Sequence, residues 1–140
     1  MIRFKDYFFD SAKVIKRTDR ATRRALSKFG AFVRRTSKQS IRKRKKTSAP
    51  GKPPSSHTGL LKKFIFFGYD ARNKSVVIGP ERLSQNKRGD APSVLEYGGS
   101  IKVKRRGQNR SVKIKQRPFM GPAFEKEKQN LPSIWKNSIK

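Results

Sequence analysis

Cationic side chains outnumber anionic ones by 37 to 9 in this chain of 140 residues, which gives it a formal net charge of +28. Charge repulsion at that density destabilises an isolated compact monomer. A partner that brings negative charge, or that buries additional surface, would relieve the repulsion. Nucleic acid is the usual partner for such a charge balance, and an anionic membrane or an acidic protein surface are the other candidates.

The remaining composition limits the class of protein further. The length fits a single domain, spanning residues 1–140, but only 33% of the residues are hydrophobic, so the core must be small. The chain has no cysteine, which excludes disulfides and cysteine-based zinc sites. The longest apolar run, Phe64 to Phe67, is too short to cross a bilayer, so we expect no membrane partner.

Apolar residues recur at three- and four-residue spacing in the first third of the chain, which predicts one long helix from about Ser11 to about Ile41. Asp10 is a suitable residue to cap its N-terminus. Gly30 either weakens the middle of this helix by about 1 kcal/mol relative to alanine or allows another backbone to approach closely.

A run of cations follows the expected helix and leads into a segment rich in Pro, Gly and Ser. The run consists of Arg42, Lys43, Arg44, Lys45 and Lys46, and Lys52 lies within the segment. We expect an extended, mobile, basic loop at about 42–59. The run is either a solvated helix end or an arm that lies along phosphates, and the loop after it favours the arm.

Strand signals fill the middle of the chain. Leu60–Phe67 is predicted to be a buried strand, and Ser75–Ile78 its hairpin partner. The Phe-rich run does not alternate with polar residues, so we expect it to be buried on both faces, by the core alone or by the core and a neighbouring subunit. Ile101–Lys104 and Ser111–Lys115 alternate and predict a second hairpin.

The tip of the second hairpin is basic. Its candidate polyanion contacts are Lys104, Arg105, Arg106 and Arg110. Two separate basic projections predict a broad contact with a polyanion, and no base-reading motif is present, so we expect no sequence specificity. Pro122 is suited to the first turn of a last helix. The expected fold class is α+β: a long N-terminal helix packed on a small antiparallel sheet, with a C-terminal helix.

Catalytic residues are scarce. His57 is the only histidine and is expected to be an ordinary loop residue. A general base in a small basic ribonuclease is the alternative, but no partner residue is evident. Glu96, Glu125 and Glu127 are expected to pair with the surrounding cations. No metal-ligand cluster or phosphate-binding glycine motif is visible, so we expect neither enzyme activity nor a cofactor.

Three short segments occur in a recognisable order. They are Ser48–Pro54 followed by Thr58–Leu61, then Val77–Pro80 followed by Val94–Gly99, and finally Arg117–Phe124. In this order they resemble the tail-completion and head–tail joining proteins of long-tailed bacteriophages. The group is the gp10-like one, which is related to the minor tail protein Z and tail terminator U types.

The resemblance implies a structural virion protein of the phage neck, assembled in the bacterial host cytoplasm into a ring that is commonly hexameric. Its partners would be other copies of the chain, portal, adaptor or tail-tube proteins, and packaged DNA. The candidates for subunit interface or core are Phe64, Phe66, Glu96, Tyr97, Phe119, Met120, Phe124 and Trp135. A stand-alone, sequence-nonspecific nucleic-acid-binding protein of ribosomal or nucleoid type is the alternative.

Overall fold

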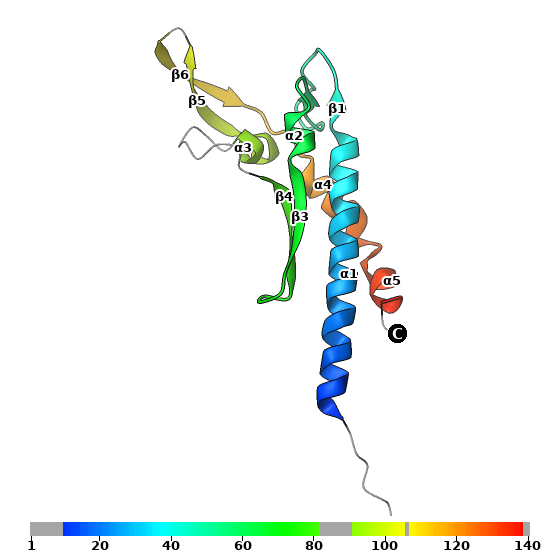
Figure 1. Cartoon of the computed structure of the whole chain (residues 1–140). Coiled ribbons are helices and arrows are strands. Elements are labelled where there is room, and N and C mark those ends of the chain that lie inside the picture. The colour runs from blue at the N-terminus through cyan, green and yellow to red at the C-terminus, as the bar shows by residue number, and fades with distance from the viewer. Residues whose placement is uncertain (1–9, 82–90, 106, 139–140) are drawn as a thin grey trace, which may run out of the picture.

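The structure is a computed structural model, and it describes residues 10–81, 91–105 and 107–138. Helix α1 (Ser11–Ser40) is its longest element (Figure 1). The strands β3 (Ile65–Asp70) and β4 (Ser75–Pro80) pack against α1, as do the helices α4 (Met120–Lys128) and α5 (Leu131–Lys136). The hydrophobic core therefore lies around the second half of α1.

The predicted long helix is confirmed, and its capping residue is the expected one. The Asp10 side chain accepts a hydrogen bond of 2.9 Å from the backbone nitrogen of Lys13, which satisfies one of the free N–H groups of the first turn. The helix ends because Ile41 adopts an extended backbone conformation, and its side chain is buried.

Gly30 allows the β3–β4 hairpin to approach α1 closely. A Cβ atom at this position would lie 2.7 Å from Cγ2 of Val76 and 2.9 Å from Cδ2 of Phe67. Two side chains, rather than another backbone, therefore occupy the space that the glycine leaves. Packing against the hairpin offsets the low helix propensity of glycine.

The predicted strand Leu60–Phe67 is wrong in two respects. Its first half is a single helical turn, α2 (Leu60–Lys63), which begins after Gly59 at φ 80°. Its second half, in β3, is not buried on both faces by the core of the subunit alone, because Ile65 is buried whereas Phe66 is 45% exposed. The physical reason is that, among the described strands, β3 pairs only with β4, and α1 covers one face of this hairpin, so alternate residues point outward. Burial of the outer face by a neighbouring subunit stays a prediction.

Two groups of buried side chains form the core. The first joins α1 to α4 and α5, and its members are Ala25, Phe29, Val33, Ala123 and Ile134. Phe124 adds an edge-to-face contact, with ring centroids 5.5 Å apart, to Phe29. The second group joins the end of α1 to β3 and the start of α4, and it consists of Ile41, Ile65 and Phe119.

A second hairpin extends away from this core (Figure 1). It consists of β5 (Gly99–Arg105) and β6 (Gln108–Ile114), and α3 (Ala91–Tyr97) packs at its base. The described strands thus form separate two-stranded sheets instead of one, and β1 (Arg42–Lys43) and β2 (Ser55–Ser56) make a short parallel pair. The α+β class is confirmed, with a long N-terminal helix, small antiparallel sheets and a C-terminal helix.

Candidate polyanion-binding and assembly surfaces

The basic loop at 42–59 folds back on the protein, so the expectation of an extended loop is wrong, whereas its contact with phosphates stays a prediction. Its two ends meet where β1 pairs with β2. Its middle is held by the segment after β6: the backbone nitrogen of Gly51 donates to Gln116 O over 2.9 Å, and Nε of Arg117 donates to Ser48 O over 3.0 Å. These backbone partners close the loop without requiring helix or strand propensity from its Pro, Gly and Ser residues.

The predicted polyanion contacts are accessible wherever the structure describes them. Exposed side chains are those of Arg42, Lys43, Arg44, Lys45, Lys46, Lys52, Lys104 and Arg110. The side chain of Arg105 and the whole of Arg106 lie outside the described residues. The loop and the second hairpin lie at the same end of the molecule (Figure 1), and the contacts of Arg117 and Gln116 link them. The two predicted projections therefore form one basic end.

The sequence predicts that the closed loop contacts a polyanion, so neutralising part of the loop is expected to weaken DNA binding in a salt-dependent way. For the triple variant Arg44→Gln, Lys45→Gln, Lys46→Gln, we expect the slope of log affinity against log salt on duplex DNA to fall by up to about 3, because each phosphate that the protein neutralises contributes about 0.9. The measurement is a fluorescence titration at several salt concentrations. The matched control, Lys13→Gln, Lys16→Gln, Arg17→Gln, removes equal charge from the other end of the molecule, and an equal change in slope there would contradict a localised contact.

Few of these cations are neutralised within the protein. In the described part of the chain, the ion pairs are Lys74 with Asp19 at 2.7 Å and Lys128 with Glu125 at 4.0 Å. The hydrogen bond from Lys74 to Asp19, together with the attraction of that carboxylate, raises the pKa of Lys74. Most of the positive charge is thus left to interact with partners outside the chain.

Glu96 is not the ion-pair partner that the sequence predicts, because its carboxylate binds the start of helix α4. Its carboxylate accepts hydrogen bonds from the backbone nitrogens of Phe119, Met120 and Gly121 at 2.8, 3.0 and 2.7 Å. These N–H groups have no partner within the helix, and the helix dipole favours a negative charge there. Glu96 therefore holds α3 against α4 inside one subunit.

Glu127 also departs from the ion-pair expectation. It is buried, and it accepts hydrogen bonds from Oγ1 of Thr36 and from Nδ2 of Asn130, the latter at 3.2 Å. It thereby joins α4 to α1 through neutral donors. Of the three predicted pairs, only that of Glu125 is observed, with Lys128.

The predicted core and interface residues divide into two groups. Phe119 is buried, and Phe64 and Met120 are half-buried. Tyr97, Phe66, Phe124 and Trp135 are exposed large apolar or aromatic side chains. The first group serves the core of the subunit, whereas the second group is available to a partner.

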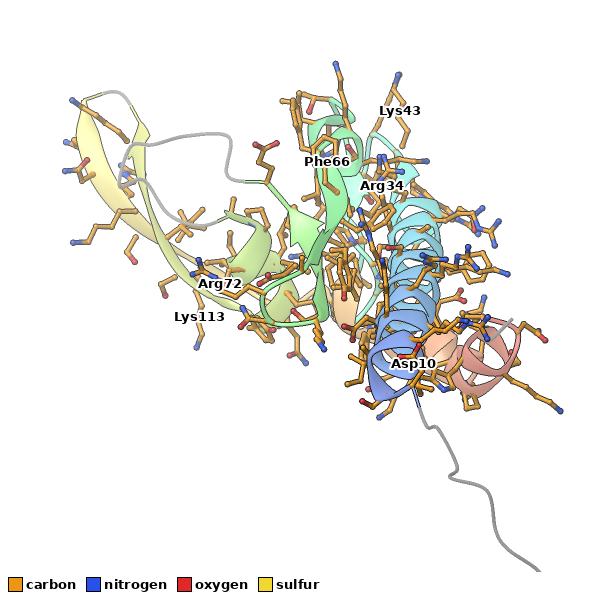
Figure 2. The ribbon with its side chains drawn as sticks, turned by 60° about the horizontal axis from the view of Figure 1, so that its bottom comes forward. Asp10, Arg34, Lys43, Phe66, Arg72 and Lys113 are labelled. Carbon is orange, nitrogen blue, oxygen red and sulfur yellow. The ribbon has the colours of Figure 1, made fainter. Side chains whose placement is uncertain are left out.

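The structure adds a cluster that the sequence did not predict, which we call the cationic aromatic cluster. It consists of Arg34, Lys38, Lys62, Lys63, Phe64 and Phe66. Arg34 and Lys38 of α1 both lie 5.9 Å from the centre of the Phe66 ring, and Figure 2 shows Arg34 beside Phe66. The α1 residues of the cluster and the residues 62–66 lie far apart in the sequence. The i,i+4 spacing of Arg34 and Lys38 on α1 was therefore the only sequence signal of a cationic face.

Burial and mutual repulsion act on the cations of this cluster. Partial burial, followed by the charges of Arg34 and Lys62, lowers the pKa of Lys38. Arg34 is held in place because its Nε donates a hydrogen bond of 2.8 Å to Ile65 O. The fixed cations beside an exposed aromatic ring form a surface suited to an anionic group.

His57 is exposed on the closed loop. The described residues contain no group of three or more metal-ligating side chains. None of the helices in the described ranges has both the length and the apolar character needed to cross a membrane.

Comparison with protein-family models, curated proteins and solved structures finds no match to this chain.

Proposed function

We propose that the chain is a structural subunit of a phage neck, which assembles into a ring that joins or seals head and tail and presents its basic end to DNA or to acidic partner proteins. The order of the three sequence segments supports the neck role. The exposed charge of the closed loop and of the second hairpin supports the contact with a polyanion.

The observation that carries the proposal is the β5–β6 hairpin. Ile101 lies opposite Val112 on one face of it, and Val112 is 44% exposed. A two-stranded hairpin is only marginally stable in water, and the described residues of α3 cover this face only at its base. Covering that face with a neighbouring subunit would stabilise it, and an interface between different surfaces of two copies generates a ring when the rotation closes.

The start of α1 is similarly uncovered. Residues 11–18 are all exposed, including Val14 and Ile15. These turns extend beyond the β3–β4 hairpin and the C-terminal helices (Figure 1). We infer that a neighbouring subunit covers Val14 and Ile15 on this projecting helix.

The segments that carry the resemblance also meet in space. Arg117 donates through its backbone nitrogen to Leu95 O over 2.6 Å and through its side chain to Ser48 O. Segments 48–54, 94–99 and 117–124 therefore form one junction between the closed loop, α3 and α4. This junction gives the three segments a common structural role within the subunit.

Light scattering at about 1 M salt, after nuclease treatment, tests the ring because charge contacts are then screened beyond about 3 Å. We expect a single oligomeric mass for the wild type. Val112→Lys should yield monomers, whereas Ser111→Lys should keep the oligomer, since the added charge is the same but lies on the opposite face of β6. A wild type that stays monomeric at high protein concentration would contradict the ring.

The alternative, a stand-alone nonspecific nucleic-acid-binding protein, is favoured by the exposed cations alone. It predicts that copies of the chain no longer associate once nuclease has removed the nucleic acid. The same experiment separates the two functions, because only the ring survives both nuclease and high salt.

A further inference from the structure

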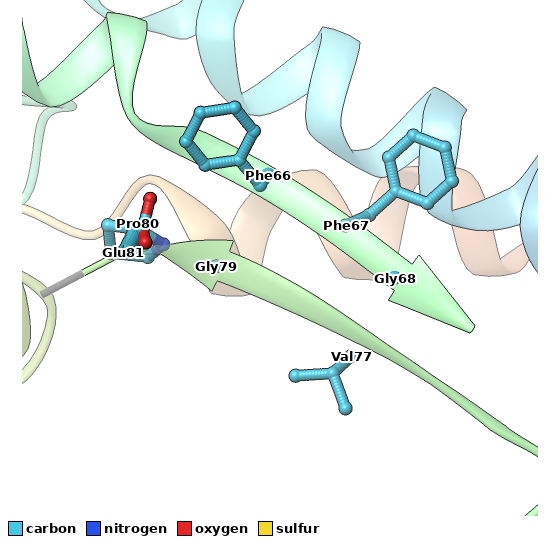
Figure 3. Close-up of a pocket in the computed structure, with 7 residues that line it drawn as sticks. All are labelled: Phe66, Phe67, Gly68, Val77, Gly79, Pro80 and Glu81. Carbon is cyan, nitrogen blue, oxygen red and sulfur yellow. The ribbon is translucent and has the colours of Figure 1, made fainter. Parts of the chain in front are cut away.

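The outer face of the β3–β4 hairpin contains an open apolar groove (Figure 3). Phe66 lies opposite Gly79, and Val77 lies opposite Gly68. Each large apolar residue thus faces a glycine across the hairpin. Phe66 and Val77 therefore lie diagonally opposite each other, one at each end of the groove. Pro80 and Glu81 complete one side of it.

Neither glycine is required by the fold of the subunit itself. Gly68 and Gly79 are not among the glycines with positive φ, so no unusual backbone conformation demands them. No atom of the residues that the structure describes lies within 4 Å of where a Cβ would be at either position. Glycine weakens the interior of a strand, and it often marks a place where another molecule approaches the backbone.

Positive charge is concentrated at the Phe66 end of this groove. Arg34 and Lys38 flank the Phe66 ring, and Lys63 lies 5.8 Å from the ring centre of the neighbouring Phe64. No ion pair neutralises these cations within the described residues. An anionic group bound here would relieve the repulsion that Lys38 experiences from Arg34 and Lys62.

The face also carries acidic side chains. Glu81 lies at the Phe66 end of the groove, where its backbone nitrogen donates to Phe64 O over 2.9 Å, and Asp70 follows Gly68 on the same face of β3. Val77, at the other end of the groove, is 66% exposed. A nucleic-acid strand carries a phosphate at every nucleotide and would bring some of them near these carboxylates. A second copy of this chain is also a poor match, because it has 9 acidic residues against 37 basic ones.

We propose that this face binds an extended, acidic and apolar polypeptide segment of another protein. A carboxylate of that segment contacts the cationic aromatic cluster, and an aliphatic or aromatic side chain fills the groove between Phe66 and Val77. The glycines let the bound backbone lie directly on the hairpin. This docking surface goes beyond the proposed ring and does not depend on it, because the ring is attributed to β5–β6 and the start of α1.

The test uses the full-length protein and a random peptide display library. The library is selected on the wild type and counter-selected on Gly79→Val, which has the same charge but a filled groove. We expect the retained peptides to combine Asp or Glu with an aliphatic or aromatic residue. Gly79→Val should be at least as stable as the wild type, since its side chain meets no atom and valine favours strands.

Titration of the retained peptides then assigns the contacts. We expect Phe66→Ala to weaken binding by about tenfold or more, whereas Phe124→Ala, which removes an exposed ring elsewhere, should leave it unchanged. The double variant Lys38→Gln, Lys62→Gln should weaken binding and reduce its salt dependence. The double variant Lys126→Gln, Lys128→Gln, with equal charge loss on α4, serves as the control.

Several results would overturn the proposal. One is a retained set that is empty or lacks acidic residues. Another is equal binding of the retained peptides by Phe66→Ala and the wild type. If Gly79→Val instead abolishes binding of an oligothymidine strand, the face is a nucleic-acid surface. If it abolishes the oligomer in light scattering, a second copy occupies the face. If Gly79→Val loses peptide binding but keeps the oligomer, the result supports a docking surface that is separate from the ring interface.

Discussion

Replacing Phe119 with alanine is expected to lower the free energy of unfolding by about 4 kcal/mol, because a fully buried ring is removed and a cavity remains. Phe119 is 1% exposed and joins Ile41 at the end of α1 to Ile65 in β3. The free energy of unfolding of a whole domain is only about 5–15 kcal/mol. The variant should therefore be marginally folded, as urea denaturation followed by circular dichroism would report.

Phe124→Ala is the matched control for this experiment. Phe124 lies one turn further along the same segment, but it is 41% exposed and contacts Phe29 only edge to face. We expect a loss of about 1 kcal/mol, which is the range of an aromatic pair contact. Similar losses for both variants would show that Phe119 does not join the two parts of the core.

Replacing Glu96 with glutamine is expected to cost about 2 kcal/mol, because charge-assisted hydrogen bonds to three backbone donors are removed or weakened. Glutamine offers one acceptor oxygen, and its amide nitrogen would face N–H groups that also donate. Urea denaturation measures the total loss. Amide hydrogen exchange at Phe119, Met120 and Gly121 reports the local opening of α4.

Glu125→Gln controls for the change in net charge, which is the same in both variants. Glu125 is exposed and its distance to Lys128 is 4.0 Å. An exposed pair of this kind contributes at most about 1 kcal/mol and often nothing measurable. A loss at Glu125→Gln as large as that at Glu96→Gln would attribute the effect to overall charge instead of to the start of α4.

The long helix and the second hairpin were predictable because their signals are local. A period near 3.6 in the apolar residues specifies an amphipathic helix. The predicted end, at about Ile41, differs by one residue from the observed end at Ser40, because Ile41 is the C-cap. Alternation in residues 101–104 and 111–115 likewise specified β5 and β6, although both strands extend further than the apolar residues that marked them.

The outward orientation of Phe66 was not predictable, because it depends on the absence of a further described strand or helix on the outer face of the hairpin. An apolar run is expected to be buried, and the sequence does not state how many strands a sheet will contain. With two strands and one helix, half of the run must face outward. The same limit hid the cationic aromatic cluster, since Arg34 and Lys62 are brought together only by the packing of α1 on β3.

Glu96 and Glu127 were misassigned for a related reason. Among so many cations, an ion pair is the most frequent expectation for a carboxylate. The partners are instead the free N–H groups at the start of α4 and a hydroxyl of α1. Neither can be found without knowing which elements are adjacent.

The docking of the last helices on α1 also sets an order of events during synthesis. Thr36 and its partner Glu127 are 91 residues apart, so at about 5–20 residues per second α1 emerges from the ribosome roughly 5–20 s before α4 can cover it. During that interval the apolar stripe of α1 is open to wrong partners. The cations that surround the stripe keep nascent copies apart by repulsion, which favours completion of each subunit before any two can associate.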